Sequence, residues 1–262
     1  MLKIRCKQIE VFKIEATNHF EDDMVAHIRQ FFPNHFGMAG QSVVRDVVRY
    51  GIQRSNTYGF VTQRNMCLYI TVMAMLGSNF DKDFFFPWVP SILNDGNSPA
   101  STRAERLADV ALCYMKEIGG KENIDINRAF VRLRKTYSLL ATREPPRDFE
   151  SYMKKILQSL YPKKYAVLGE SVIERLIWHG IQTAAAYNIT EKKGRLLLIV
   201  LMFFIGSLCD SEPFCPWLCK TLNDPLAKNE KAKINRLYRE STFYLEQWLT
   251  QPWRKDVDNV RL

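Results

Sequence analysis

The sequence lacks the patterns of a disulfide-rich secreted protein and of a membrane protein. It has only six cysteines among 262 residues, and their spacing is irregular. Its longest apolar run, residues 196–208, includes a glycine and is shorter than the roughly 20 residues that a membrane span needs. No apolar run follows the first basic residues, so a signal peptide is not predicted. We therefore expect a soluble, cytoplasmic protein.

Metal-binding and catalytic motifs are also missing. The four histidines form no HExxH or HxH spacing, and the chain has no GxSxG, P-loop or GxGxxG motif. Cys209, Cys215 and Cys219 lie close together, but the aligned positions of the internal repeat described below hold Phe, Phe and Pro. A cysteine at a position where the other repeat has phenylalanine behaves as a small hydrophobic residue rather than as a zinc ligand. We predict no enzymatic activity, no catalytic residues, no bound metal and no cofactor.

The chain has few acidic residues for its number of basic ones. There are 37 Lys and Arg against 28 Asp and Glu, which gives a formal charge of +9. Such a charge favours an acidic partner: a protein, a nucleic acid or a membrane surface. The densest basic runs, 128–135 and 228–239, suit solvated helix faces. Without a helix-turn-helix pattern or an aromatic–basic RNA motif, nucleic-acid binding is the less favoured alternative.

The main positive feature is an internal repeat. Residues 20–95 align without a gap on residues 149–224, an offset of 129 positions (149 − 20). A period of this length is typical of a duplicated domain, because solenoid repeats are much shorter. We therefore predict two tandem units, residues 1–120 and 121–262. Identical residues include Gly40/Gly169, Gly51/Gly180, Gly77-Ser78/Gly206-Ser207, Asp81/Asp210 and Pro87-Trp88/Pro216-Trp217.

Hydrophobic periodicity predicts the same helices in both repeats. Residues 172–187 and their first copy have apolar side chains at the spacing of an amphipathic helix. Gly51 and Gly180 fall on its apolar face, where the missing side chain would let another helix approach closely. Alternation typical of a strand is confined to residues 2–5 and 131–134. We expect an all-α protein, built as two duplicated bundles of about four to five helices each.

Capping residues predict where these helices begin and end. Ser171, with Glu174 three positions later, predicts a capping box at the start of the amphipathic helix. Thr62 and Thr190 are placed to cap the strongly apolar helix that follows. Between these two helices, the Tyr-Gly pair of the first copy and the Tyr-Asn pair of the second favour a left-handed C-terminal cap.

One acidic loop recurs before each Pro-Trp pair and supplies the candidate site residues. Carboxylates two residues apart can bind a cation or act in acid–base chemistry, but they can also cap the next helix, which is the interpretation we favour. The tryptophans can anchor the short helix to the bundle or serve as partner hot spots. The candidate partner-binding residues are Asp81, Asp83, Trp88, Asp210, Glu212 and Trp217.

Several spaced motifs of the first repeat agree, in order, with one protein family. They are MLKIR (1–5), FEDDMVAHIRQFFP (20–33), RYGIQRSNTYG (49–59) and LGSNFDKDFFFPWVPSILND (76–95). In these motifs the chain resembles a family of uncharacterised bacterial proteins encoded among type VI secretion and polymorphic-toxin genes. The second copy departs from the pattern at Asn188 and Cys209.

The resemblance implies a small cytoplasmic accessory protein that acts by binding another protein. As an adaptor or chaperone, it would hold a toxic effector and deliver it to the secretion spike. As an immunity protein, it would instead cover the active site of a toxin in the producing cell. We favour the adaptor, since two similar bundles would form a cradle for a client, and a basic surface suits an acidic one. The oligomeric state stays open.

Overall fold

The chain folds entirely into helices and the loops that join them. A computed structural model describes residues 6–227 and 229–250, and within these ranges it has twelve α-helices, two short 3-10 helices and no β-strand. The prediction of an all-α protein is confirmed for this part of the chain. The helices are α1 (Cys6–Phe31), α2 (Pro33–Thr57), α3 (Gln63–Leu76), α4 (Val89–Leu93), α5 (Ala100–Gly119), η1 (Lys121–Asn123), α6 (Ile124–Thr142), α7 (Phe149–Leu160), α8 (Pro162–Leu168), α9 (Glu170–Ala186), α10 (Lys192–Ile205), η2 (Cys209–Ser211), α11 (Pro216–Leu222) and α12 (Glu230–Thr250).

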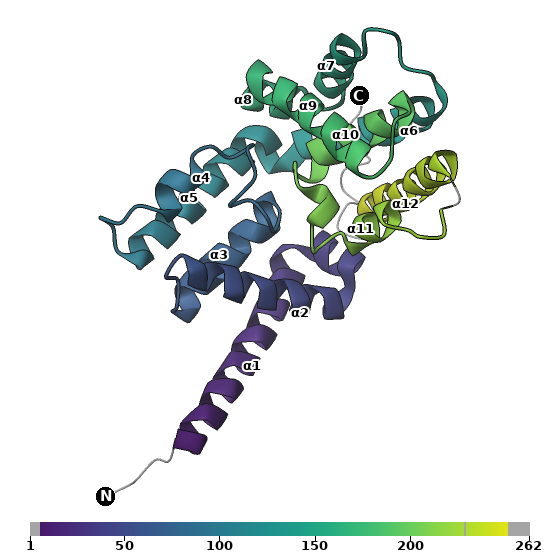
Figure 1. Cartoon of the computed structure of the whole chain (residues 1–262). Helices are drawn as coiled ribbons and strands as arrows, with labels where there is room; N and C mark the ends of the chain where they lie inside the picture. The colour runs from purple at the N-terminus through teal and green to yellow at the C-terminus, as the bar shows by residue number, and fades with distance from the viewer. Residues whose placement is uncertain (1–5, 228, 251–262) are drawn as a thin grey trace, which may run out of the picture.

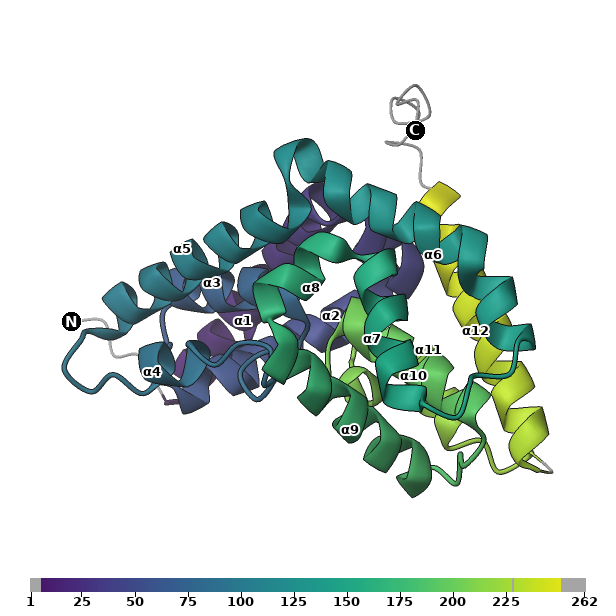
Figure 2. The ribbon, with the colours of Figure 1, turned by 90° about the horizontal axis from the view of Figure 1, so that it is seen from above.

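The helices of the two repeats lie on either side of a shared centre. Seen from above, α3, α4 and α5 occupy one side and α9, α10 and α12 the other (Figure 2). The N-terminal part of α1 extends away from the rest of the molecule (Figure 1). Contacts across the centre are reciprocal, because α5 packs on α8 while α12 packs on α2, whose first turns align with α8.

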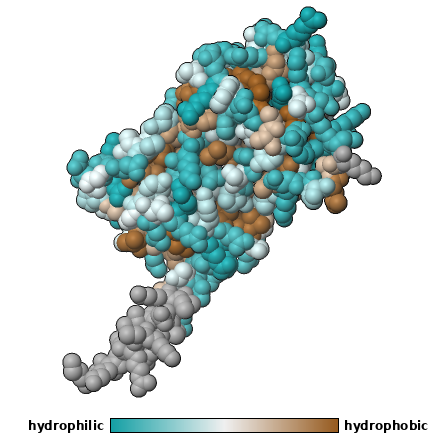
Figure 3. Space-filling view, in the orientation of Figure 1, coloured by the Kyte–Doolittle hydropathy of each residue, from teal (hydrophilic) through white to brown (hydrophobic). Residues whose placement is uncertain are grey.

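One face of the molecule is mostly polar (Figure 3). The face drawn in Figure 3 is largely hydrophilic, and its apolar residues gather in separate patches. In the part of the chain that the structure describes, no helix is both long enough and apolar enough to cross a membrane.

Gly51 and Gly180 allow two helix pairs to approach closely, as the sequence predicts. A Cβ atom on Gly51 would lie 2.6 Å from Ile70 Cγ1, on α3. A Cβ atom on Gly180 would lie 2.4 Å from Cγ1 of Ile199, on α10. Ile70 and Ile199 are themselves 129 positions apart and fully buried (199 − 70 = 129). The same helix–helix contact is therefore built twice, from aligned residues.

The predicted capping box at Ser171 is wrong. A glycine in a left-handed conformation separates α8 from α9, namely Gly169 with φ 77°, and α9 begins at Glu170 without a side-chain cap. Glu174 accepts a hydrogen bond from Lys154 Nζ at 2.7 Å instead of turning back to the helix start. Gly40, with φ 79°, forms the equivalent break inside α2. Only glycine adopts this backbone geometry without strain, so the break is fixed by the glycine pair.

The apolar helices α3 and α10 begin differently. Thr62 accepts a hydrogen bond from the backbone N–H of Asn65 and caps α3, as predicted. Thr190 does not cap α10, so that prediction is wrong. Its backbone N–H and hydroxyl both donate to the carboxylate of Glu230, which comes from the start of α12. A residue far along the chain thus replaces the local cap, and sequence spacing could not reveal it.

Two other predicted features have clear outcomes. The left-handed ends of the amphipathic helices are confirmed, with φ 77° at Gly59 and φ 57° at Asn188. The strand-like segment 131–134 lies inside α6, so its alternation reflects one face of a helix and the strand signal was misleading. Residues 2–5 lie outside the described residues.

We predict that Gly180→Ala destabilises the protein, although alanine normally stabilises a helix by about 1 kcal/mol relative to glycine. The new methyl group would collide with Ile199, whose side chain is fully buried, and overpacking of this kind costs about 1–3 kcal/mol. Chemical denaturation would measure the loss, and Gly51→Ala should behave in the same way. Gly96→Ala is the matched control, because nothing lies within 4 Å of its added methyl group. A stabilising Gly180→Ala would contradict the close contact.

Candidate functional site: a central cavity and the contacts around it

Two buried carboxylates join the repeats to each other. Asp83 accepts hydrogen bonds from the backbone N–H and the hydroxyl of Ser207, at 2.8 and 2.6 Å. Glu212 accepts from the backbone N–H of Ser78, at 2.8 Å, and from its hydroxyl. The two contacts are reciprocal, since Asp83 aligns with Glu212 and Ser78 with Ser207 (212 − 83 = 207 − 78 = 129). We call them the carboxylate–serine contacts.

Glycines make room for these contacts. Gly77 and Gly206 precede the serines and have positive φ values of 103° and 142°. A Cβ atom on Gly77 would lie 3.3 Å from an oxygen of Glu212, and one on Gly206 would lie 3.3 Å from an oxygen of Asp83. The identical Gly-Ser pairs of the sequence are therefore explained by the close approach of a carboxylate from the other repeat.

Each carboxylate also binds the backbone of its own loop. Asp83 accepts from the N–H of Phe85 at 2.9 Å, and Glu212 from the N–H of Phe214 at 3.1 Å. Burial raises the pKa of Asp83 and of Glu212, whereas the hydrogen bonds from serine and backbone act in the opposite direction. The prediction that these carboxylates cap the next helix is wrong, because α4 and α11 both begin without a side-chain cap. Asp83 and Glu212 bind the loop that precedes the short helix, and their serine partners lie in the other repeat.

The other two acidic candidates bind side chains of their own repeat. Asp81 pairs with Arg54 and accepts a hydrogen bond from the Tyr58 hydroxyl at 2.7 Å. Asp210 accepts from the Tyr187 hydroxyl at 3.0 Å. The second repeat has threonine where the first has Arg54, so only Asp81 has a guanidinium partner. Both aspartates hold the end of an amphipathic helix against the acidic loop.

The two tryptophans are half-buried and packed against aromatic rings. The ring centroids of Trp88 and Phe86 are 6.1 Å apart, and those of Trp217 and Tyr244 are 5.4 Å apart. All six candidate residues therefore have contacts within the chain. That any of them contacts a partner stays a prediction.

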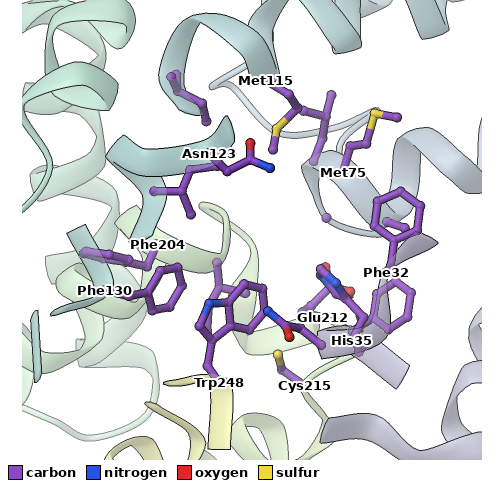
Figure 4. A pocket seen from close by; sticks show the side chains of 18 of the residues that line it. Phe32, His35, Met75, Met115, Asn123, Phe130, Phe204, Glu212, Cys215 and Trp248 are labelled. Atoms are coloured by element: carbon purple, nitrogen blue, oxygen red, sulfur yellow. Dashed lines mark hydrogen bonds between the residues drawn. The ribbon is translucent and has the colours of Figure 1, made fainter. Parts of the chain in front are cut away.

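A cavity of about 590 Å³ lies where the repeats meet, beside the carboxylate–serine contacts. Its lining combines the ends of both apolar helices, α3 and α10, with residues of α2, α5, α6, α8 and α12. In Figure 4, Phe130 and Phe204 lie on one side of it, and Phe32 and Met75 lie on the other. This volume is in the range of small-molecule binding sites, roughly 300–1,000 Å³.

Aromatic rings are numerous on the lining. Phe130 stacks on Trp248 with ring centroids 4.8 Å apart, and Phe204 meets Phe130 edge-on at 5.2 Å. His35 approaches Trp248 edge-on at 5.5 Å. Burial lowers the pKa of His35 to about 4, so at neutral pH its imidazole is uncharged and adds no cation to the cavity.

Lys164 brings a basic side chain to this lining. It aligns with His35 (164 − 35 = 129), and only 7% of its surface is exposed. Its ammonium group lies 5.3 Å from the ring centre of Phe85 and 5.5 Å from that of Phe203. Among the described residues it has neither a hydrogen bond nor an ion pair. Burial lowers its pKa from 10.5 to about 8, and the negative charge of Asp83 acts in the opposite direction.

Sequence reasoning missed the importance of this pair. The alignment of His35 with Lys164 argues against a shared metal site, but it does not show that the two positions line one cavity. One sequence signal is present in both repeats: His35 comes two residues after Pro33, and Lys164 comes two residues after Pro162. Each is therefore a basic residue in the first turn of a helix, next to large apolar residues.

An exposed aromatic surface on α9 was also missed. Trp178 is 63% exposed, and Arg175, one turn earlier, lies over the ring of Phe84 at 4.5 Å. The residue of the first repeat that aligns with Trp178 is Arg49 (178 − 129 = 49), which is bound to Glu21. Trp178, Arg175 and Phe84 form what we call the Trp178 surface. It joins residues of both repeats, and the aligned positions hold Arg49, Asp46 and Pro213 instead.

The comparisons give this chain no relative. No family model matches the sequence, and neither a curated protein nor a solved structure is significantly similar to it. The resemblance to the type VI secretion family thus stays a prediction. Within residues 6–227 and 229–250, no group of three or more His, Cys, Asp and Glu side chains is placed to hold a metal ion.

We predict that Ser207→Ala destabilises the protein by about 1–3 kcal/mol, because Asp83 would lose a hydrogen bond while it remains buried. Ser78→Ala should have a similar effect through Glu212. Thermal and chemical denaturation would measure both changes. Ser159→Ala is the control, since this exposed hydroxyl binds only a backbone carbonyl of its own helix. Equal stability of Ser207→Ala and Ser159→Ala would show that the contact contributes nothing.

We also predict that Lys164→Met stabilises the protein at pH 7 by roughly 1–3 kcal/mol, since it removes a buried, unpaired charge. Below about pH 8 the amine is charged in both the folded and the unfolded state, so the wild type bears the full cost of burial. Between about pH 8 and 10.5 only the folded protein loses the proton, and the stability of the wild type rises.

The advantage of Lys164→Met should therefore be greatest below pH 8 and shrink towards pH 10. Denaturation curves at several pH values test this trend. Lys163→Met, at an exposed neighbouring position, is the matched control and should stay within about 0.5 kcal/mol of the wild type. A Lys164→Met protein less stable than the wild type at pH 7 would contradict the burial cost.

Proposed function

We propose that the protein is a non-catalytic, cytoplasmic accessory of a bacterial type VI secretion system, which binds a toxic effector or a spike protein as adaptor or chaperone. The motif pattern of the first repeat supports this role. The observation that carries the binding function is the Trp178 surface, where an exposed tryptophan lies beside an arginine stacked on a phenylalanine. Trp and Arg are the residue types most enriched in protein–protein hot spots.

We further propose that the chain is a duplicated pair of helical bundles in which fold and binding are divided. Aligned residues make matching contacts at Gly51 and Gly180 and at the carboxylate–serine contacts. Features that both repeats share thus maintain the fold. Partner recognition would then use positions at which the repeats differ. Trp178 and Arg175 are at such positions, because they align with Arg49 and Asp46.

Charge supports a protein partner of acidic character. The formal charge of +9 would speed the encounter with such a partner, and a fully buried tryptophan at the interface would then supply most of the affinity. Mutation of surface lysines should therefore slow association, whereas truncation of Trp178 should speed dissociation.

We predict that the tagged protein recovers a toxin or spike protein encoded beside its own gene, and that Trp178→Ala weakens this binding at least about 30-fold. The loss follows from removal of the exposed indole, and calorimetry with the recovered partner measures it. Phe243→Ala is the matched control, because Phe243 is equally exposed but lies on α12. Recovery of no neighbouring gene product by the folded protein would count against the proposed function.

Co-expression separates the adaptor role from the immunity role. As an adaptor, the protein should be required for secretion of the toxin, while cells that lack it remain protected by a separate factor. If the protein alone rescued cells from the toxin and secretion did not depend on it, the immunity role would replace the proposed one.

A further inference from the structure

The lining of the central cavity includes a donor for which no described residue provides an acceptor. The Lys164 ammonium can donate three hydrogen bonds, yet among the described residues it contacts only the faces of Phe85 and Phe203. More than nine-tenths of the side chain is buried, so bulk water does not solvate it freely. A charge buried in this way is costly unless a partner compensates it.

Two further donors on the lining lack an acceptor. The hydroxyl of Tyr114 and the indole N–H of Trp248 are buried without a hydrogen-bond partner in the described structure. The buried carboxylate of Asp83 is not their acceptor, and it binds Ser207 and Phe85 instead. Glu212, also on the lining, is likewise bound by serine and backbone donors. Among the described residues, the lining therefore has donors without acceptors, whereas its carboxylate, Glu212, already has partners.

The rest of the lining is apolar and continues beyond the cavity. Phe130, Phe204 and Trp248 form an aromatic wall on one side. An adjoining hollow of about 320 Å³ shares Met75, Met115 and Asn123 with the cavity. Methionine side chains adapt to flexible apolar groups, so a chain of methylenes could extend from the cavity into this hollow.

We propose that the cavity binds an amphipathic carboxylic acid, with its carboxylate at Lys164 and its alkyl chain along Phe130, Trp248 and Met75. The carboxylate supplies the hydrogen-bond acceptors that Lys164 lacks among the described residues and adds to the negative charge of Asp83, and the alkyl chain covers the aromatic wall. A cationic ligand would be repelled by Lys164, and a neutral one would leave the ammonium unpaired. The site is separate from the Trp178 surface and does not depend on the proposed accessory function.

Calorimetric titration of the full chain with decanoate, below its micelle concentration, tests the proposal. We expect one decanoate per chain, bound at least tenfold more tightly than decanol or decylammonium, because only the acid pairs with Lys164. Lys164→Met should reduce the affinity for decanoate to that for decanol, while Lys163→Met should leave it unchanged. The comparison of the three ligands on the wild type stands even if the Lys164 variant fails to fold.

Three results would overturn the proposal. The first is no decanoate binding up to about 1 mM. The second is equal affinity for the acid, the alcohol and the amine, or several equivalent sites per chain, which indicates adsorption to apolar surface. The third is unchanged decanoate affinity in a folded Lys164→Met protein, which places the acid elsewhere.

Discussion

The structure depends on two carboxylates buried where the repeats meet. Asp83 and Glu212 each bind a Gly-Ser turn of the other repeat, and burial alone would make both of them unfavourable. Hydrogen bonds from serine hydroxyls and backbone N–H groups compensate that cost only when both repeats are folded and in contact. The glycines, the serines and the acidic loop are therefore needed together, and the cavity lies beside them.

Much of the fold could be predicted from the sequence because the repeat tests each pattern twice. Helix periodicity, the close packing at Gly51 and Gly180 and the left-handed ends at Gly59 and Asn188 are local properties, and the structure confirms them. Features that need a distant partner were missed. The capping of α10 by Glu230 and the pairing of Asp83 with Ser207 each join residues that lie far apart in the chain, and no spacing rule connects them.

The candidate site illustrates the same limit. The sequence singled out the acidic loops and the tryptophans because both repeats contain them, and shared residues turned out to be those with internal contacts. Lys164 and Trp178 each occur in one repeat only. Burial of Lys164 is unfavourable for stability, and exposure of Trp178 is unfavourable for solubility. A buried ammonium without an ion pair and an exposed indole both break the usual rules for a stable, soluble fold. Residues of this kind are expected at functional sites.

The central claim is that the carboxylate–serine contacts join the two repeats into one cooperative structure. Native-state hydrogen exchange of the Ser78 and Ser207 amides tests it most directly, because each N–H donates to a carboxylate of the other repeat. Both amides should exchange only through global unfolding, with the same free energy as the core of α3 and α10. Exchange of either amide through a lower-energy local opening, while the helices stay protected, would contradict the account.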